Sequence, residues 1–165
     1  MHRSLPPLAA ALLLAPPALA QQVPAWITAD TAARTVQLAL EAGRTADGRR
    51  ALNGEREGSL QVIVPLGWTL KWTWTNRDTT EKRSLIVMTE REKLPERAGR
   101  PAFTNAMTRA AGSGLAPGAT DVSEFVVEEP GWFWVLGGVP GHAIDGEYIG
   151  LRVDPDARGV AVRRK

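Results

Sequence analysis

The side chains that could do chemistry gather near the end of the chain. His142 is followed at short spacing by two carboxylates, Asp145 and Glu147, and the other histidine, His2, lies in the apolar N-terminal segment. An imidazole with carboxylates can hold a mononuclear ion of the harder metals. A purely structural alternative stays open, in which His142 packs and hydrogen-bonds within its loop and Glu147 is exposed or forms an ion pair.

Neither residue predicts an enzyme. A carboxylate such as Glu147 acts as a general acid or base only beside a suitable reacting group, and no nucleophile or second catalytic carboxylate follows from its spacing. The chain has no cysteine, which removes thiolate chemistry as well as disulfides. We therefore predict no catalytic residues, and stability must come from the core.

The N-terminal segment 1–20 predicts export. Arg3 gives it a positive start, residues 5–14 are an apolar run, and Ala18-Leu19-Ala20 is a small-x-small cleavage site. An uncleaved anchor is the alternative, but the run is too short for an ordinary membrane span, and no later stretch approaches the necessary length. We expect a secreted or periplasmic protein with no membrane span after signal cleavage.

The charge balance gives no case for nucleic acid or an acidic membrane as a partner. The chain has 20 Lys and Arg against 18 Asp and Glu, and losing Arg3 with the signal leaves 19 basic residues. The basic end at 163–165 is expected to be solvated.

Short β-strands must hold the loop that contains His142, Asp145 and Glu147 in place. Apolar residues alternate with polar ones in 69–75, where Leu70, Trp72 and Trp74 share one face, and in 59–64, where Val62 and Val64 do so. Gly and Pro turns separate these stretches. The segments expected to be strands are 35–40, 59–64, 69–75, 84–88, 121–127, 131–136 and 148–153.

This pattern predicts an all-β fold, an antiparallel Greek-key sandwich with at most one short helix, around 102–110. One domain is expected over 21–153, with a flexible C-terminal tail over 154–165. The charged stretches 80–83 and 89–100 are expected to be solvated loops, which could also form a partner surface.

Several stretches of the chain resemble the sulfocyanin-like cupredoxins, a family of blue-copper proteins. The resemblance runs from about Trp26 to Val153 and is most specific in the Gly138-Val139-Pro140-Gly141-His142-Ala143 segment. Other matching stretches are 51–54, 60–68, 76–84, 101–103 and 114–118. The resemblance implies a cupredoxin fold, with copper as the family cofactor.

In that family the copper ligands are a histidine at the end of a charged turn and a closing loop of the form Cys-x4-His-x4-Met. The turn histidine falls on Arg83, and the loop ligands fall on Gly137, His142 and Glu147, of which only His142 is retained. A type-1 site needs a thiolate, two imidazoles and a weak axial thioether. The resemblance therefore implies a degenerate copper site, with no metal and no cofactor expected.

Alternatives stay open for Arg83 and for the two tryptophans of segment 131–136. Arg83 either forms an ion pair with Glu147, tying the turn to the closing loop, or extends into solvent, where ion pairs contribute little. Trp132 and Trp134 share one face of their strand while Phe133 and Val135 share the other. The tryptophans either pack in the core or an edge, or form an outward docking platform.

Three functions compete. The first is an exported, copper-free cupredoxin-like module that binds or scaffolds an exported protein or a small ligand. The second is a copper-binding electron-transfer protein of the sulfocyanin type. The third is an altered mononuclear metal site built from His142 and carboxylates such as Asp145 or Glu147. The missing ligands favour the first.

Overall fold

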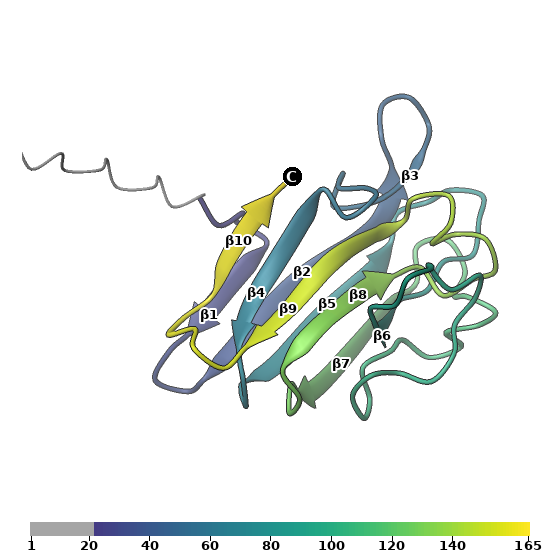
Figure 1. Ribbon diagram of the computed structural model, residues 1–165. Coiled ribbons are helices and arrows are strands. Elements are labelled where there is room, and N and C mark those ends of the chain that lie inside the picture. The colour runs from purple at the N-terminus through teal and green to yellow at the C-terminus, as the bar shows by residue number, and fades with distance from the viewer. Residues whose placement is uncertain (1–21) are drawn as a thin grey trace, which may run out of the picture.

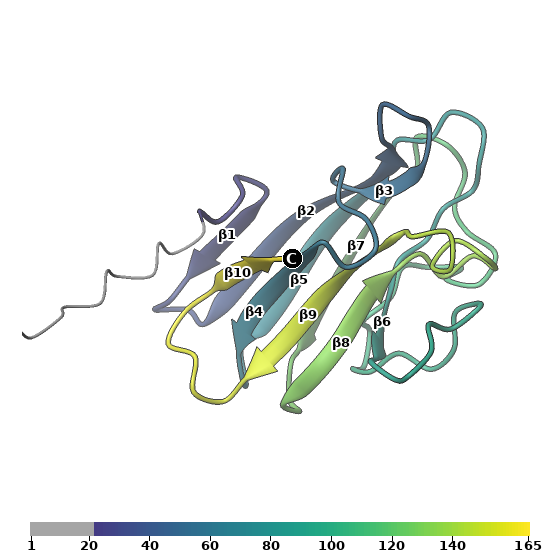
Figure 2. The same cartoon turned by 45° about the horizontal axis from the view of Figure 1, so that its top comes forward.

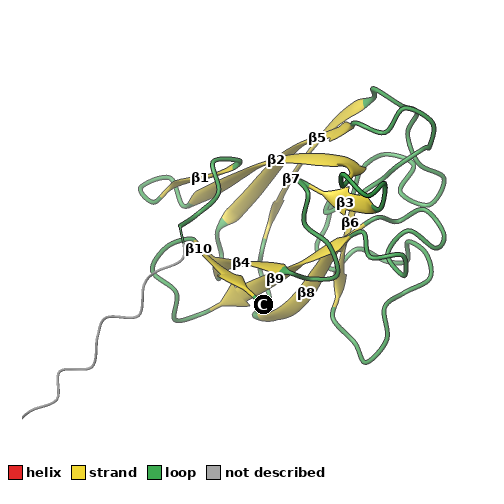
Figure 3. Cartoon of the chain, turned by 90° about the horizontal axis from the view of Figure 1, so that it is seen from above, coloured by secondary structure: helices red, strands yellow, loops and turns green. Residues whose placement is uncertain are grey.

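The computed structural model describes residues 22–165, so the expected signal segment 1–20 lies outside the described residues. These residues form two packed β-sheets, seen edge-on in Figure 3. The all-β sandwich is thus confirmed. None of the described residues forms a helix of the length and apolarity needed to cross a membrane.

The first sheet has strand order β1-β2-β5-β7, and β3 also pairs with β2. Most of its strands show the expected alternation of buried and exposed residues. Its members are β1 (Ile27–Asp30), β2 (Thr35–Arg44), β3 (Arg50–Leu52), β5 (Thr69–Asn76) and β7 (Thr120–Val126).

The second sheet has strand order β10-β4-β9-β8-β6, and Figure 1 shows it in front of the first. Its members are β4 (Leu60–Pro65), β6 (Ile86–Thr89), β8 (Gly131–Leu136), β9 (Tyr148–Asp154) and β10 (Ala161–Arg164). The seven expected strands are all present, with bounds shifted by a few residues. The largest shift is in β2, which was expected over 35–40 and continues to Arg44.

Both sheets are mixed rather than purely antiparallel. β2 runs parallel to β5, and β4 runs parallel to β9, while the remaining pairs are antiparallel. Parallel neighbours cannot be joined by a tight hairpin, so they bring distant parts of the chain together. Sequence alternation predicts faces but not this pairing.

The core between the sheets contains the predicted residues. Trp72 and Trp74 are fully buried, and Val62, Val64 and Leu70 are buried with them. Trp72 meets the ring of Phe125 edge-on at 5.2 Å. The predicted strand faces are therefore confirmed.

The expected flexible tail over 154–165 is wrong for its second half. β10 pairs with β4 in antiparallel register, with Val162 opposite Val62, and Val162 is buried against the core. An apolar side chain at this point makes an edge strand favourable, and the sequence prediction overlooked it. β1 and β3 were likewise not expected, because each is too short to show alternation.

The optional helix around 102–110 does not form. The segment consists of turns in which Asn105 has a positive φ of 66°, incompatible with a right-handed helix. Phe103 and Ala106 are nevertheless buried in the core. Their irregular spacing explains why the helical pattern in the sequence was weak.

Candidate functional site

Three loops meet at one end of the sandwich. They are the charged turn (residues 76–83), the long connection between β6 and β7, and the closing loop (residues 137–147). Figures 1 and 2 show the loops that follow β6 and β8 crowding together at this end. Backbone bonds join them, since Arg83 exchanges both of its backbone hydrogen bonds with Leu115 and Ala98 donates to the carbonyl of Gly138.

Arg83 lies at the centre of this end, with a side chain that is fully buried. Its Nη1 donates to Glu147 Oε2 at 2.5 Å, and its Nη2 donates to Asp78 Oδ2 at 2.5 Å. The side chains of all three residues have 0% exposure. The ion pair with Glu147, one of the two alternatives left by the sequence, is the arrangement found, and the solvent-directed alternative is wrong.

The charged turn is shaped so that Asp78 faces inward. Asp78 Oδ1 accepts the backbone N–H groups of Thr80 and Glu81, and its own N–H donates to Asn76 Oδ1. The Asn76 amide donates to the carbonyls of Glu81 and Leu115. Such side-chain bonds to nearby backbone define Asx-type turns.

These contacts determine the ionisation of Asp78. Burial alone would raise the pKa of its carboxyl, but the hydrogen bond from Arg83 and the backbone bonds from Thr80 and Glu81 outweigh burial and hold the pKa well below its usual range. Asp78 is therefore a carboxylate at neutral pH, and it offsets the buried charge of Arg83.

Further arginines extend the network outward. Arg44 contacts Asp78 at 2.9 Å and Glu81 at 3.0 Å, and Arg50 donates two bonds to Glu81 and one to Asp145. The bond from Arg50 holds the pKa of Glu81 below its ordinary value, and the same bond raises the pKa of Arg50. Fork-like Arg–carboxylate pairs of this kind fix geometry.

The closing loop brings Gly137, His142 and Glu147 together. The backbone N–H of Gly137 donates to the carbonyl of Glu147, whose own N–H donates to the carbonyl of His142. A Cβ added at Gly137 would lie 2.9 Å from Glu147 Cδ and 3.1 Å from His142 Cβ. The structure thus places Gly137 against both neighbours, and Arg83 reaches the same point from the turn.

His142 is buried beside the ion pair without a good hydrogen bond. Its Nδ1 lies 3.3 Å from Glu147 Oε2, close enough for an ion pair if the ring is protonated, but the geometry is not that of a hydrogen bond. Glu147 Oε1 and Arg83 Nε are also buried without a partner among residues 22–165. Unpaired buried polar atoms cost stability, so this end of the fold is not optimised for stability alone.

The side chains present do not fit a copper ion. A type-1 centre requires a thiolate and two imidazoles. This site supplies one imidazole, from His142, and the carboxylate of Glu147 beside it is in contact with the guanidinium of Arg83. Asp145, the other carboxylate considered with His142, turns toward Arg50 instead. In the described part of the chain no group of three or more His, Cys, Asp or Glu side chains is placed to hold a metal ion.

Several residues of this network escaped the sequence analysis. Arg44, Arg50 and Asp78 lie in stretches whose sequence indicates polar turns, and Glu81 lies in the stretch 80–83, which was expected to be a solvated loop. The Asn-x-Asp-x-Thr pattern at 76–80 is a usable signal, because short polar side chains at this spacing form Asx turns. The pairing of Arg50 with Glu81 has no local signature.

Comparison with protein families identifies a relationship over most of the chain. The family model for the sulfocyanin (SoxE) domain matches residues 23–158. No curated protein matches the chain in sequence.

Solved structures share the fold at low identity. Reduced auracyanin from Roseiflexus castenholzii superposes with a TM-score of 0.51 at 20% identity, covering 72% of this chain and 97% of the other. A variant rusticyanin gives 0.51 at 18% identity, covering 73% of this chain and 78% of the other. The copper nitrite reductase from Nitrosomonas europaea gives 0.54 at 24% identity, with 74% of this chain covered but only 42% of the reductase.

Proposed function

Since the chain belongs to the sulfocyanin family, whose members are copper-binding cupredoxins, we propose that it is a copper-free member, an exported module that acts by binding a protein or a small ligand. Four positions carry the proposal. Arg83, Gly137, His142 and Glu147 stand where the family pattern has a histidine, a cysteine, a histidine and a methionine. Only His142 keeps its ligand type.

The buried pair of Arg83 and Glu147 is the single observation that best supports a copper-free member of the family. The guanidinium is a permanent cation, because its pKa lies far above neutrality. A cation opposes a copper ion at contact distance, and the repulsion is strongest where water is excluded. Two buried carboxylates, Asp78 and Glu147, lie 2.5 Å from its Nη atoms and offset its charge in that position.

The pair also suggests how the fold keeps the shape of a copper protein without copper. In this proposal the ion pair connects the charged turn to the closing loop, as a metal bridging the same two segments would. The bond from the Gly138 N–H to Ser84 Oγ supports the same connection, and the bond from Arg83 to Asp78 holds the guanidinium within the charged turn. A rigid end of this kind can still present loops to a partner.

In this proposal the protein lacks the chemical groups that electron transfer and catalysis would need. Without a metal the chain has no site for a reversible one-electron couple, and Glu147 is enclosed and held by Arg83 rather than open to a substrate. The exported location rests on the signal-like segment 1–20, and cleavage there would leave Gln21 as the first residue.

The experiment that tests this function adds Cu(II) and Cu(I) to purified protein, followed by absorption spectra, metal analysis and voltammetry. We expect no stoichiometric copper, no intense visible band and no reversible couple, in the wild type and in His142→Ala alike. An intense blue band that the variant loses would establish a copper electron carrier instead. Colourless stoichiometric metal, lost in the same variant, would establish an altered metal site.

A further inference from the structure

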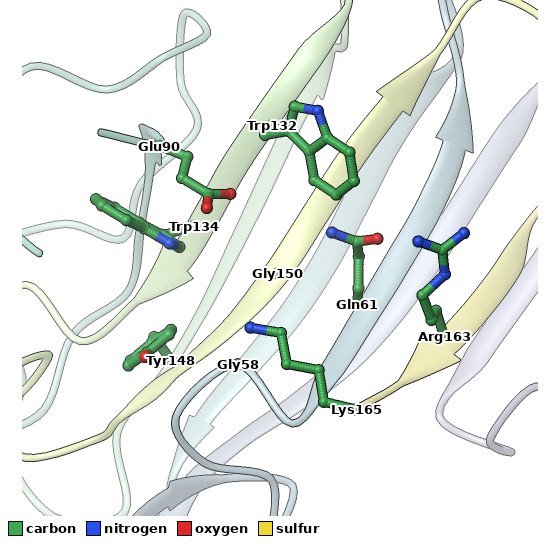
Figure 4. Close-up of a pocket in the computed structure, with 9 residues that line it drawn as sticks. All are labelled: Gly58, Gln61, Glu90, Trp132, Trp134, Tyr148, Gly150, Arg163 and Lys165. Carbon is green, nitrogen blue, oxygen red and sulfur yellow. The ribbon is translucent and has the colours of Figure 1, made fainter. Parts of the chain in front are cut away.

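A pocket of about 290 Å³ lies on the outer face of the second sheet, away from the core. Its floor is one row of residues paired across neighbouring strands, in which Trp134, Gly150, Gln61 and Arg163 follow one another. Figure 4 shows Gly150 at the bottom, with side chains standing around it. The pocket exists because Gly150 has no side chain, and a Cβ there would lie 3.3 Å from Gln61 Cβ and Cγ.

Aromatic rings form one part of the wall. Trp132 is 44% exposed although it is the largest side-chain type, and Trp134 and Tyr148 stand beside it around the pocket. Trp132 is held in place by Arg152, whose guanidinium lies 4.8 Å from the ring centre and is itself paired with Asp154. A fixed, exposed tryptophan costs hydrophobic free energy unless something covers it, which points to a ligand.

Polar side chains without partners form the rest of the wall. The Oε1 of Gln61 is buried and accepts no hydrogen bond within residues 22–165. The carboxylate of Glu90 enters no ion pair there either, and it points toward the pocket in Figure 4, opposite Lys165. Burial, with the negative charges of Glu57 and Glu90, raises the pKa of Tyr148, which keeps its hydroxyl a donor.

These features select a ligand with an apolar face and a rim of hydroxyl groups. A purely apolar molecule would leave the charged rim unsatisfied, and a cation would meet Arg163 and Lys165 against one carboxylate. A pyranose ring offers C–H groups to aromatic faces and both donors and acceptors to the amide, carboxylate and ammonium groups. The pocket volume, at the small end for ligand sites, suits one ring.

We infer that this pocket binds a saccharide, with one pyranose unit seated over Gly150 against Trp132 and Trp134. Glu90 binds its hydroxyls from the Trp134 side of Gly150, and Gln61 and Lys165 bind them from the other side (Figure 4). No residue that lines the pocket belongs to the charged turn or the closing loop, so the inference does not depend on the absence of copper. The proposal of saccharide binding and the proposal of a copper-free protein can therefore be refuted independently of each other.

The test uses saturation-transfer NMR on the purified protein with D-glucose, N-acetylglucosamine and D-galacturonic acid as separate probes. We expect saturable binding of at least one sugar with a roughly millimolar Kd, ordinary for a single-ring ligand. Trp132→Ala and Gly150→Val should each weaken it by about tenfold or more. Val122→Ala, which alters a 56% exposed apolar residue on the other sheet, should leave it unchanged.

Absence of saturable binding by all three sugars would overturn the inference. It would be overturned equally if Trp132→Ala bound as the wild type does, or if Val122→Ala lost binding to the same extent. Should Gly150→Val fail to fold, Trp132→Ala still decides the outcome, because an exposed ring contributes little to stability. Circular dichroism checks that each variant is folded.

Discussion

Arg83 and Glu147, 64 residues apart in sequence, form a fully buried ion pair with an N–O distance of 2.5 Å. The pair joins the charged turn to the closing loop at one end of the sandwich. Breaking a buried pair leaves one uncompensated charge, which costs far more than losing an exposed pair. Removing one partner of this pair should therefore lower the stability of the protein measurably.

Glu147→Gln should destabilise the protein by roughly 3 kcal/mol, because Arg83 would keep only part of its compensating charge in a buried place. Urea unfolding followed by tryptophan fluorescence measures the change. The matched control is Glu41→Gln, which breaks the exposed pair with Arg77. That control should cost no more than about 1 kcal/mol. Equal losses in the two variants would contradict the structural role of the Arg83 pair.

Stability should fall on acidification. Asp78 and Glu81 have pKa values held below their ordinary range in the folded protein, so each contributes stability that is complete above its unfolded pKa and is lost as pH falls through the folded pKa. Urea unfolding at about pH 7, 5 and 3 should show most of the decrease below about pH 4, the ordinary carboxyl range.

Glu81→Gln supplies the comparison for this pH dependence, because Glu81 is partly exposed and its loss should leave the protein folded. The variant should be less stable than wild type at neutral pH, and the difference should shrink as the pH falls. A constant difference from neutral to acidic pH would refute the assignment of a low pKa to Glu81.

Trp72→Ala should lower the free energy of unfolding by roughly 3 to 5 kcal/mol, the range for removing a large buried aromatic side chain. Trp72 is fully buried and contacts Phe125, so the substitution leaves a cavity between the sheets. Thermal unfolding is a suitable measurement. Trp132→Ala removes the same side chain from an exposed position and should change the melting temperature little. A small shift for Trp72→Ala would contradict its core position.

Restoring the family ligands should restore copper binding if the proposed correspondence of positions is right. The triple variant Arg83→His, Gly137→Cys, Glu147→Met, with His142 unchanged, supplies two imidazoles, a thiolate and a thioether. After copper addition we expect an intense blue band, because that transition requires a copper–thiolate bond. The control replaces Gly137→Cys by Gly137→Ser and should stay colourless. A folded, colourless triple variant would disprove the correspondence.

Strand faces could be predicted from the sequence because alternation is local. Leu70, Trp72 and Trp74 repeat at every second position, and the structure buries all of them. The parallel pairing of β4 with β9 could not be predicted in this way, since it joins segments about ninety residues apart with no shared local signal. The edge strand β10 could not be predicted because it has only four residues, one of them buried (Val162), and basic residues follow it.

At the site, the positions that match the family pattern could be predicted from the sequence. The side chains that form ion pairs with them could not. The resemblance to the family's closing-loop pattern indicates Gly137, His142 and Glu147. Asp78 lies within a polar turn whose sequence suggests exposure, yet its side chain is buried because Arg83 neutralises it. Such burial of a charge depends on a partner that only the folded chain supplies. The pocket over Gly150 depends likewise on a row of residues from four strands.

The placement of β4 between β9 and β10 affects how the chain can fold as it is made. Both hydrogen-bonded neighbours of Leu60–Pro65 come from residues 148–164, so β4 stays unpaired on both edges until nearly the whole chain has been synthesised. Contacts that close over such long loops form slowly, and open strand edges favour aggregation in the meantime. A chain ending before Tyr148 should therefore aggregate rather than form a smaller stable domain.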